Sequence, residues 1–427
     1  MTSTRFTADA NCAARLDADD PVAPFRDEFC FPAGPDGEPE IYLVGNSLGL
    51  ATTRTRTYVD AELDTWATKG VRGHFQGDHP WTLYHELLTG PMAELVGGRP
   101  EEVVVMNSLT VNLHLLLVSF YRPSAHRHKI LIEEHAFPSD HFVVESQLRH
   151  HGFDPADSLV VVGPRPGADL IEHDDLLAAI DEHGEELAVV LLPGVQYYTG
   201  QVFDMSDLVR ATHACGARVG FDLAHAVGNI PLQLHDWNVD FAAWCTYKYL
   251  NGGPGSTGAA FVHEHHLGDP ELPRFEGWWG TNKERRFEMA TTFDPISTVE
   301  AWQLSNAPIL SMAPVRAGLD LFRTAGGIEV LRNKSEAQLA WFDFLLDSRF
   351  AGRVESITPR AMHQRGCQFA LRVTTPGIEG RDVFESLEAA GVACDWRYPD
   401  VIRVAPVPLY NSFTDIWRFT EILDELV

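Results

Sequence analysis

The chain has 427 residues, and 45% of them are hydrophobic, which is enough for a large domain and a smaller one with its own core. Its 33 basic and 60 acidic residues give a formal net charge of −27, which argues against nucleic acids and anionic membranes as partners. The six cysteines lack paired spacing, which argues against a zinc ribbon or a disulfide framework. Reduced cysteines, and the lack of a signal-like or membrane-spanning apolar run, predict a soluble cytoplasmic protein.

The chain begins with a segment rich in Asp, Pro and Gly, residues 1–40, for which we expect irregular or partly helical structure. A short strand over residues 41–44 and helices over residues 52–68 and 80–97 should follow. From there on, apolar runs of strand length alternate with segments of helix length. The expected strands are 103–106, 130–132, 159–162, 188–192, 219–222, 241–247 and 259–262, and the expected helices are 111–120, 141–151, 174–183 and 207–216. This alternation predicts a mostly parallel sheet that helices cover on both faces.

The order of the elements changes beyond Asn306. The expected elements there are helices at 309–324 and 327–347, a strand at 368–373, a helix at 382–390, strands within 392–407 and a final helix at 412–426. This α+β pattern predicts a second, smaller domain. The expected organisation is an N-terminal segment (1–50) that packs with the small domain, a large domain (51–305) and the small domain itself (306–427).

Two of the expected strands end in polar residues. One ends at Asp222, and the other runs through Tyr247 to Lys248. Ligands gather at the carboxyl ends of the strands in open α/β sheets. An aspartate and a lysine at that edge suit pyridoxal phosphate, because the lysine forms a Schiff base with the aldehyde and the aspartate keeps the pyridine nitrogen protonated. Either residue alone would most often be a surface charge or a turn residue, but the nearly uncharged, aromatic-rich strand before Lys248 favours a shielded site.

Three further motifs have a weaker meaning. The glycines of residues 253–258 match the dinucleotide-binding spacing, but an expected strand follows them instead of a helix, so we reject that interpretation. Residues 107–110 precede a helix and are either an ordinary cap or a phosphate-binding helix start. Residues 263–266 (His-Glu-His-His) resemble a metal cluster, but neighbouring strand residues point to opposite faces and no second ligand set supports zinc. We expect a solvated strand end there and no metal.

Several long strings of residues resemble kynureninase. They are residues 221–229, 234–237, 244–251 and 402–411, with further matches at 43–49, 137–140 and 194–200. The chain is therefore identified as a member of this family of pyridoxal-phosphate enzymes of the aspartate-aminotransferase fold type. The resemblance implies fold type I of the PLP-dependent transferases, with a large domain built on a mostly parallel sheet and a smaller α+β C-terminal domain.

The resemblance also implies roles for individual residues. Lys248 would be the Schiff-base lysine, Asp222 would pair with the pyridine nitrogen, and Tyr247 would bind the cofactor and could pass a proton. Arg403 would hold the substrate α-carboxylate, a task suited to a planar bidentate donor. The other cofactor positions are Leu109 and Thr110 near the phosphate, Phe137 on the ring face, Pro138, Ser139, Asp140, His225, Trp278 and Asn306, and the other substrate positions are Ser47, His74 and Asn306.

The implied reaction is hydrolysis of the Cβ–Cγ bond of kynurenine, which yields an anthranilate and L-alanine in tryptophan catabolism or a derived biosynthetic pathway. Lys248 would act as the general base at Cα. By the resemblance, His74 and Asn306 match positions that line the aromatic ring and are of the type seen in animal enzymes, which favour 3-hydroxykynurenine. Against an unsubstituted ring these polar groups would lie unpaired. Alternatively, His74 packs near the entrance and Asn306 serves only the cofactor phosphate. The resemblance further implies a homodimer with shared active sites.

Two other interpretations stay open from the sequence. A cysteine desulfurase or an aminotransferase would share the fold, but a desulfurase needs a reactive cysteine on a mobile loop and usually carries His where Tyr247 stands. A non-catalytic protein built on a degenerate enzyme would have lost Lys248 or Asp222, and both residues are present.

Overall fold

A seven-stranded sheet forms the centre of the large domain in the computed structural model, which describes residues 6–427. The strand order is β4 (Val103–Val105), β10 (Ala259–Val262), β9 (Phe241–Trp244), β8 (Arg218–Asp222), β7 (Leu187–Pro193), β5 (Lys129–Glu133) and β6 (Leu159–Val162). Strand β10 pairs antiparallel with both of its neighbours, and β9, β8, β7, β5 and β6 pair in parallel. The predicted mostly parallel α/β sheet is thus confirmed.

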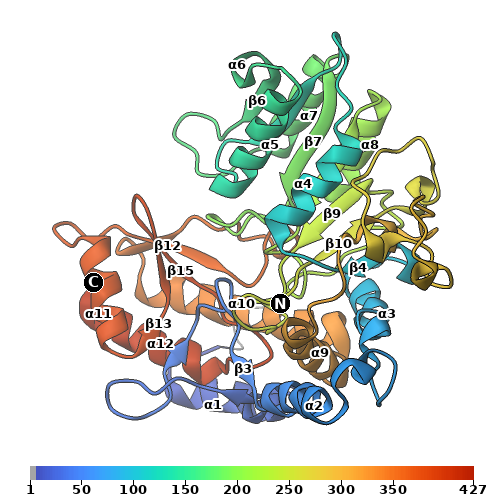
Figure 1. Cartoon of the computed structure of the whole chain (residues 1–427). Coiled ribbons are helices and arrows are strands. Elements are labelled where there is room, and N and C mark those ends of the chain that lie inside the picture. The colour runs from blue at the N-terminus through green and yellow to red at the C-terminus, as the bar shows by residue number, and fades with distance from the viewer. Residues whose placement is uncertain (1–5) are drawn as a thin grey trace.

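Helices cover both faces of this sheet, as Figure 1 shows. The helices of the large domain are α2 (Thr53–Lys69), α3 (Glu86–Val96), α4 (Leu109–Phe120), α5 (Pro138–His150), α6 (Pro155–Ser158), α7 (His173–His183) and α8 (Met205–Ala214). Alternate strand residues enter different cores: Val103 and Val105 pack in one cluster with side chains of α3, α7 and α8, whereas Val104 packs in the other with α4 and α5. Successive side chains of a strand point to opposite faces of the sheet, so each face has its own apolar layer.

The small domain has a hydrophobic core of its own. Its antiparallel sheet has the order β11 (Val354–Ser356), β12 (Phe369–Val373), β15 (Val401–Val404) and β14 (Asp395–Arg397), and its helices are α10 (Gly327–Arg349), α11 (Gly380–Ala389) and α12 (Phe413–Leu426). The N-terminal helix α1 (Ala10–Ala18) packs against α12, and β2 (Ile41–Tyr42) pairs with β13 (Val392–Ala393). The expected small α+β unit is present, and the N-terminal segment contacts it.

Helix α9 (Ile309–Thr324) packs against α2 and α3, and its buried side chains belong to the core that also contains the large sheet. The second half of α10 instead contributes Leu339, Trp341 and Phe342 to the core of the small domain. The change from one core to the other therefore falls within α10, while the division at residue 306 stays a prediction.

The structure departs from the sequence-based elements in a few places. The helix expected from residue 80 is split into a short 3-10 turn, Trp81–Leu83, and α3, and β9 ends at Trp244 instead of at Tyr247. The chain leaves the sheet there because the Thr246 hydroxyl bonds the loop that follows, at Ser256 Oγ and the Thr257 carbonyl, both at 2.7 Å. The two-residue strands β1 (Phe29–Cys30) and β3 (Ala51–Thr52) were too short for any pattern to predict.

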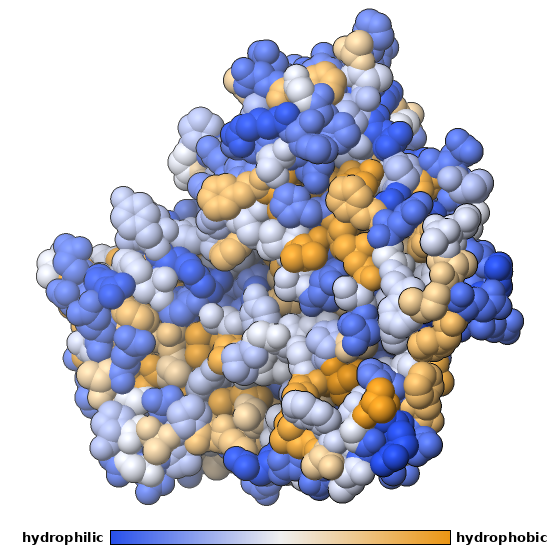
Figure 2. Space-filling model, in the orientation of Figure 1, coloured by the Kyte–Doolittle hydropathy of each residue, from blue (hydrophilic) through white to orange (hydrophobic). Residues whose placement is uncertain are grey.

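The surface is mixed in character. In the orientation of Figure 1, Figure 2 shows hydrophilic residues over most of this face and several separate apolar patches, some of them over the region of α3. Within residues 6–427, none of the helices combines the length and the apolar character that crossing a membrane requires.

Candidate active site

A pocket of about 360 Å³ lies where β5, β7 and β8 end and the small domain begins. The residues that the sequence predicted and that line it are Ser47, Leu109, Thr110, Phe137, Ser139, Asp140, Asp222, His225, Tyr247, Lys248 and Arg403. Residues from both domains and from the N-terminal segment thus meet in one place.

Lys248 is held at this pocket by the loop that follows β9. Its Nζ lies 2.8 Å from His225 Nε2. Burial lowers the pKa of Lys248 below its usual range, and burial together with the positive charge of Lys248 lowers the pKa of His225. A neutral imidazole therefore faces an amine that gives up its proton more readily than a lysine in water.

The N-terminal segment contacts the loop after β9, which carries Lys248 and is called the lysine loop below. The Gly49 N–H donates to the Tyr247 carbonyl at 2.8 Å. A Cβ atom at residue 49 would lie 2.2 Å from the Lys248 carbonyl oxygen, so only glycine allows this approach.

Two buried carboxyl groups lie near the lysine. Asp222, the last residue of β8, accepts a hydrogen bond from the Ala224 N–H at 2.8 Å, and Asp140 stands in the first turn of α5. Burial raises the pKa of both groups, and the negative charge of Asp222 raises the pKa of Asp140 further. A carboxylate at this position would suit a cationic ring nitrogen.

Glu133, at the end of β5, is a third buried carboxyl group in the pocket, and we did not predict it. Its side chain is 1% exposed, and burial raises its pKa to about 8. Its Oε1 lies 3.4 Å from Gln196 Nε2, and its Oε2 has no hydrogen-bond partner among residues 6–427. The signal was available, because Glu133 ends an apolar strand just as Asp222 does.

The start of α4 offers hydrogen-bond donors to an anion. Ser108 is the N-cap residue, but its side chain makes no capping bond, so the first N–H groups of the helix are not occupied by it. Leu109 and Thr110 open the helix and line the pocket. A Cβ on Gly258 would lie 3.3 Å from the Leu109 nitrogen, so a glycine keeps the neighbouring strand close to this helix start. Of the two interpretations of residues 107–110, the phosphate-binding helix start is therefore favoured over an ordinary cap.

Aromatic rings form one wall of the pocket. The Phe137 side chain is 46% exposed and meets the Tyr197 ring edge to face, with 5.3 Å between the ring centroids. Tyr197 was not predicted. Its exposed neighbour Phe137 presents an apolar face on which a flat ring can pack.

Arg403 lies deep in the pocket and is 1% exposed. It donates from Nε to Asp395 Oδ1 at 2.7 Å, from Nη2 to Asp395 Oδ2, and from Nη1 to the Tyr197 carbonyl at 2.5 Å. Arg397 also lines the pocket, as does Asn46, and neither was predicted.

Comparisons with known proteins place this chain in a family. The model of the kynureninase C-terminal domain matches residues 331–423. The kynureninase of Koribacter versatilis is 52% identical over 421 residues, which is 99% of this chain and 98% of that protein. The kynureninase of Myxococcus xanthus is 51% identical over 425 residues, with 99% of each chain covered. The chain belongs to the kynureninase family.

Solved structures support the fold. A C-DES variant with glycine covalently linked to its PLP cofactor has a TM-score of 0.75 at 17% identity, and covers 92% of this chain and 99% of its own. A cysteine desulfurase of Escherichia coli also has a TM-score of 0.75 at 17% identity, with 95% and 98% covered. At this identity the likeness concerns the fold alone. The desulfurase alternative therefore shares only the architecture with this member of the kynureninase family.

The residues of the pocket fit pyridoxal phosphate, the cofactor that the sequence predicted. Lys248 can reach an aldehyde, the carboxyl pair can hold a ring nitrogen, and the start of α4 can take a phosphate. Four residues that line the pocket each have a buried polar atom without a partner among the described residues: Asn46 Oδ1, Glu133 Oε2, His225 Nδ1 and Arg397 Nε. Such atoms are costly to leave unpaired, which indicates that a polar ligand completes the site.

Four predicted residues of the kynureninase site are not part of this pocket's lining in a single chain: His74, Pro138, Trp278 and Asn306. His74 ends a short 3-10 turn and packs on Trp81, with 5.3 Å between the rings. The Trp278 side chain is 47% exposed, and Asn306 lies exposed in the loop before α9.

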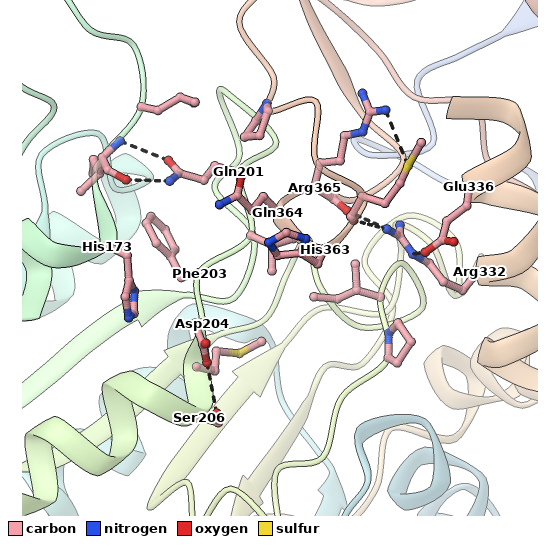
Figure 3. Close-up of a pocket in the computed structure, with 18 of the residues that line it drawn as sticks. His173, Gln201, Phe203, Asp204, Ser206, Arg332, Glu336, His363, Gln364 and Arg365 are labelled. Atoms are coloured by element: carbon pink, nitrogen blue, oxygen red, sulfur yellow. Dashed lines mark hydrogen bonds and ion pairs between the residues drawn. The ribbon is translucent and has the colours of Figure 1, made fainter. Parts of the chain in front are cut away.

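A larger cavity of about 730 Å³, drawn in Figure 3, lies between the domains. Most of the polar side chains in this cavity are hydrogen-bonded to other groups of the protein. The Gln201 amide bonds both backbone groups of Ile171, and Arg332 donates to the Met362 and Arg365 carbonyls and to Glu336. Among residues 6–427, those that line this cavity include no lysine, so we place the candidate active site in the smaller pocket.

The histidines after β10 are not the solvated strand end that we expected. His263 and His266 are buried, and His266 Nε2 lies 2.7 Å from Asp240. The side chains of Glu102, His235 and His263 come within ligand distance of one another. Glu102, however, already accepts bonds from the His235 ring and from the N–H groups of residues 99 and 264, so these contacts join the loops at this edge of the sheet.

Proposed function

We propose that the protein is a kynureninase: it hydrolyses the Cβ–Cγ bond of L-kynurenine or its 3-hydroxy form and releases L-alanine with the corresponding anthranilate. The observation that carries this proposal is the position of Lys248, whose amine contacts a neutral His225 in a pocket that also contains a buried carboxyl pair and Arg403. Family membership at about half identity over nearly the whole chain supports the reaction.

Bound pyridoxal phosphate supplies the electron sink for the carbon–carbon cleavage. The residues of the chain bind and orient it. Asp222 and Asp140 would pair with the ring nitrogen, Phe137 would pack on the ring, and the N–H groups at the start of α4 would hold the phosphate. Arg403 and its surroundings receive the α-carboxylate of the substrate, which fixes Cα near the lysine.

Lys248 moves the proton at Cα of the substrate. Its lowered pKa makes the free amine, the form that accepts a proton, more available than in water. Tyr247 complements it, because burial raises the pKa of this phenol and so keeps the hydroxyl protonated. Tyr247 lines the same pocket, with its ring centroid 6.0 Å from Lys248 Nζ, and we assign it the transfer of a proton during cleavage.

We propose that two copies of the chain form a homodimer with shared active sites. His74, Trp278 and Asn306 lie outside the pocket of their own chain, and exposed aromatic rings surround the first two. Phe75 and Phe287 are 60% and 53% exposed, and their ring centroids are 5.5 Å apart. Exposed aromatic clusters of this kind are typical of interfaces. In the dimer, these side chains complete the pocket of the other copy.

The ring subsite then contains His74 and Asn306, and we propose that 3-hydroxykynurenine is the preferred substrate. A histidine and an amide can both bond a ring hydroxyl, and both would stay unpaired against a plain ring. We assign the enzyme to tryptophan catabolism or a derived pathway in the cytoplasm.

The test is product analysis with kynurenine, 3-hydroxykynurenine and cysteine as separate substrates. We expect L-alanine and an anthranilate in equal amounts from the first two, with the higher kcat/KM for the hydroxylated one. Release of a persulfide from cysteine, without cleavage of either kynurenine, would instead identify a desulfurase. Equal or higher kcat/KM with plain kynurenine would contradict the preference alone.

The dimer is tested by mixing two inactive variants, Lys248→Ala and Trp278→Ala, after joint unfolding and refolding. If sites are shared, a mixed dimer has one site with both residues intact, and about a quarter of the activity returns in the mixture. A mixture that stays inactive, or a monomer in sedimentation, contradicts the proposal.

A further inference from the structure

Three charged side chains share one face of the small-domain sheet. Asp395 and Arg397 are two residues apart on β14, so they point to the same side, and Arg403 on β15 is paired directly opposite Asp395. Arg397 and Arg403 both line the candidate active site. The sheet therefore presents two guanidinium groups to the pocket, with one carboxylate between them.

The Asp395 carboxylate binds mainly to Arg403. Both oxygens of Asp395 accept from Arg403, through Nε and Nη2, while Nη1 donates to the Tyr197 carbonyl. This is the side-on bidentate geometry that an arginine offers to a carboxylate. Asp395 thus takes up one bidentate face of Arg403 and balances its charge.

Arg397 makes fewer hydrogen bonds than Arg403. Its Nη2 donates to Asp395 Oδ2 at 2.9 Å, and its Nε has no partner among the described residues. Its side chain is 34% exposed, whereas that of Arg403 is 1% exposed, so Arg397 lies nearer the opening. Both guanidinium carbons lie 5.9 Å from the centroid of the Tyr197 ring, which packs on Phe137.

The charges of this group do not cancel. Two guanidinium groups and one carboxylate leave a net charge of +1 beside the pocket. Burial and the nearby charge of Arg403 lower the pKa of Arg397, yet an arginine stays protonated at any physiological pH. An anionic group of a ligand in the pocket would balance the remaining positive charge.

We propose that Arg397 is a specificity-determining residue that binds the α-carboxylate of the substrate together with Arg403. Arg397 supplies the positive charge that Asp395 leaves uncompensated, and Arg403, oriented by Asp395 and Tyr197, supplies the remaining donors. The inference rests on the proposed function and extends it, because it names a second residue at the carboxylate end of the substrate. Amino acids are then selected over the corresponding amines by the pair and not by Arg403 alone.

The experiment compares Arg397→Met and Arg397→Lys with the unchanged enzyme, using kynurenine and the amine analogue that lacks the carboxylate. Loss of a charge-assisted contact should lower kcat/KM for kynurenine by about 10- to 100-fold, mainly through KM. The amine analogue should lose much less. Arg397→Lys should fall between, because it keeps the charge but not the planar donor group. Arg381→Met, a change at an exposed arginine of α11 that pairs with Glu385, is the matched control and should act like the unchanged enzyme.

A second readout does not need turnover. Binding of L-alanine, measured by its effect on the absorbance of the bound cofactor, should weaken by a similar factor in Arg397→Met. Adding Asp395→Asn to that variant restores the net charge of +1, so the double variant should bind L-alanine more tightly than Arg397→Met alone.

Unchanged kcat/KM in Arg397→Met would overturn the inference, as would an equal loss with the amine analogue, which would indicate a structural role. A double variant no better than Arg397→Met would overturn the charge argument. An unchanged enzyme that cleaves no kynurenine contradicts the proposed function instead, and the L-alanine measurement still tests the carboxylate site.

Discussion

Replacing Glu133 by Gln should make the protein more stable at alkaline pH and leave it nearly unchanged in acid. The carboxyl group is buried, and its pKa is raised to about 8 from an ordinary value of 4.5. Between these two values, the folded protein binds a proton that the unfolded chain releases. Stability is therefore lost as the pH rises from about 4.5 to 8, and a neutral amide at this position removes that loss.

The size of the effect follows from the rise of the Glu133 pKa from 4.5 to about 8, because each tenfold change in proton affinity is worth about 1.4 kcal/mol. Linkage then gives a penalty of about 1 kcal/mol at pH 5, about 2 kcal/mol at pH 6 and about 4 kcal/mol at pH 8. The other groups in contact with this region, Asp140, Asp222, His225 and Lys248, are present in both proteins, so the difference between the two isolates Glu133.

The assay is urea unfolding of the cofactor-free protein at pH 5, 6 and 8, followed by circular dichroism. The advantage of Glu133→Gln should grow with pH, and Glu134→Gln, a change at the exposed neighbouring residue, should have little effect at any pH. A difference between Glu133→Gln and the unchanged protein that stays constant from pH 5 to 8 would refute the reasoning, because it would show that Glu133 does not titrate differently in the folded state.

Other substitutions test the catalytic roles. Lys248→Ala should abolish both turnover and the yellow absorbance of the covalently bound cofactor, and a borohydride-reducible link in that variant would contradict the assignment. Asp222→Asn should lower turnover by at least about 100-fold without unfolding the protein, because losing a carboxylate beside a ring cation costs at least about 3 kcal/mol; a near-normal rate in a cofactor-loaded sample would count against it. His74→Phe should reduce the preference for 3-hydroxykynurenine by about 10-fold, for the loss of one hydrogen bond to a ring hydroxyl, and an unaltered ratio of kcat/KM values would exclude His74 as its cause.

The sequence predicted the parts of the site that are local to the sheet. Asp222 and Lys248 follow apolar runs, and a buried strand that ends in a charge is enough to place both at one edge. Glu133 gives the same signal at the end of β5 and could have been found in this way. The family resemblance added Phe137 and Asp140, whose own patterns are those of an ordinary helix start.

Other parts could not be predicted from patterns. Arg397 lies on a three-residue strand without any periodicity, and only the pairing of β14 with β15 brings it to Arg403. The exposed positions of Trp278 and Asn306 in a single chain depend on the path of long loops, which sequence patterns do not determine. The residues 245–247 were expected to continue a strand, but the hydrogen bonds of Thr246 to its own loop take the chain out of the sheet.

The contact between Gly49 and the lysine loop has a mechanical consequence. At one end, residues 41–49 are joined to the small domain, where β2 pairs with β13; at the other, the Gly49 N–H is bonded to Tyr247. The Ala405 N–H, directly after β15, also donates to the Leu43 carbonyl at 2.7 Å, so the segment connects the strand that carries Arg403 with the loop that carries Lys248. A movement of the small domain relative to the sheet would therefore be transmitted to the loop that carries Lys248, and would shift Arg403 and Lys248 together.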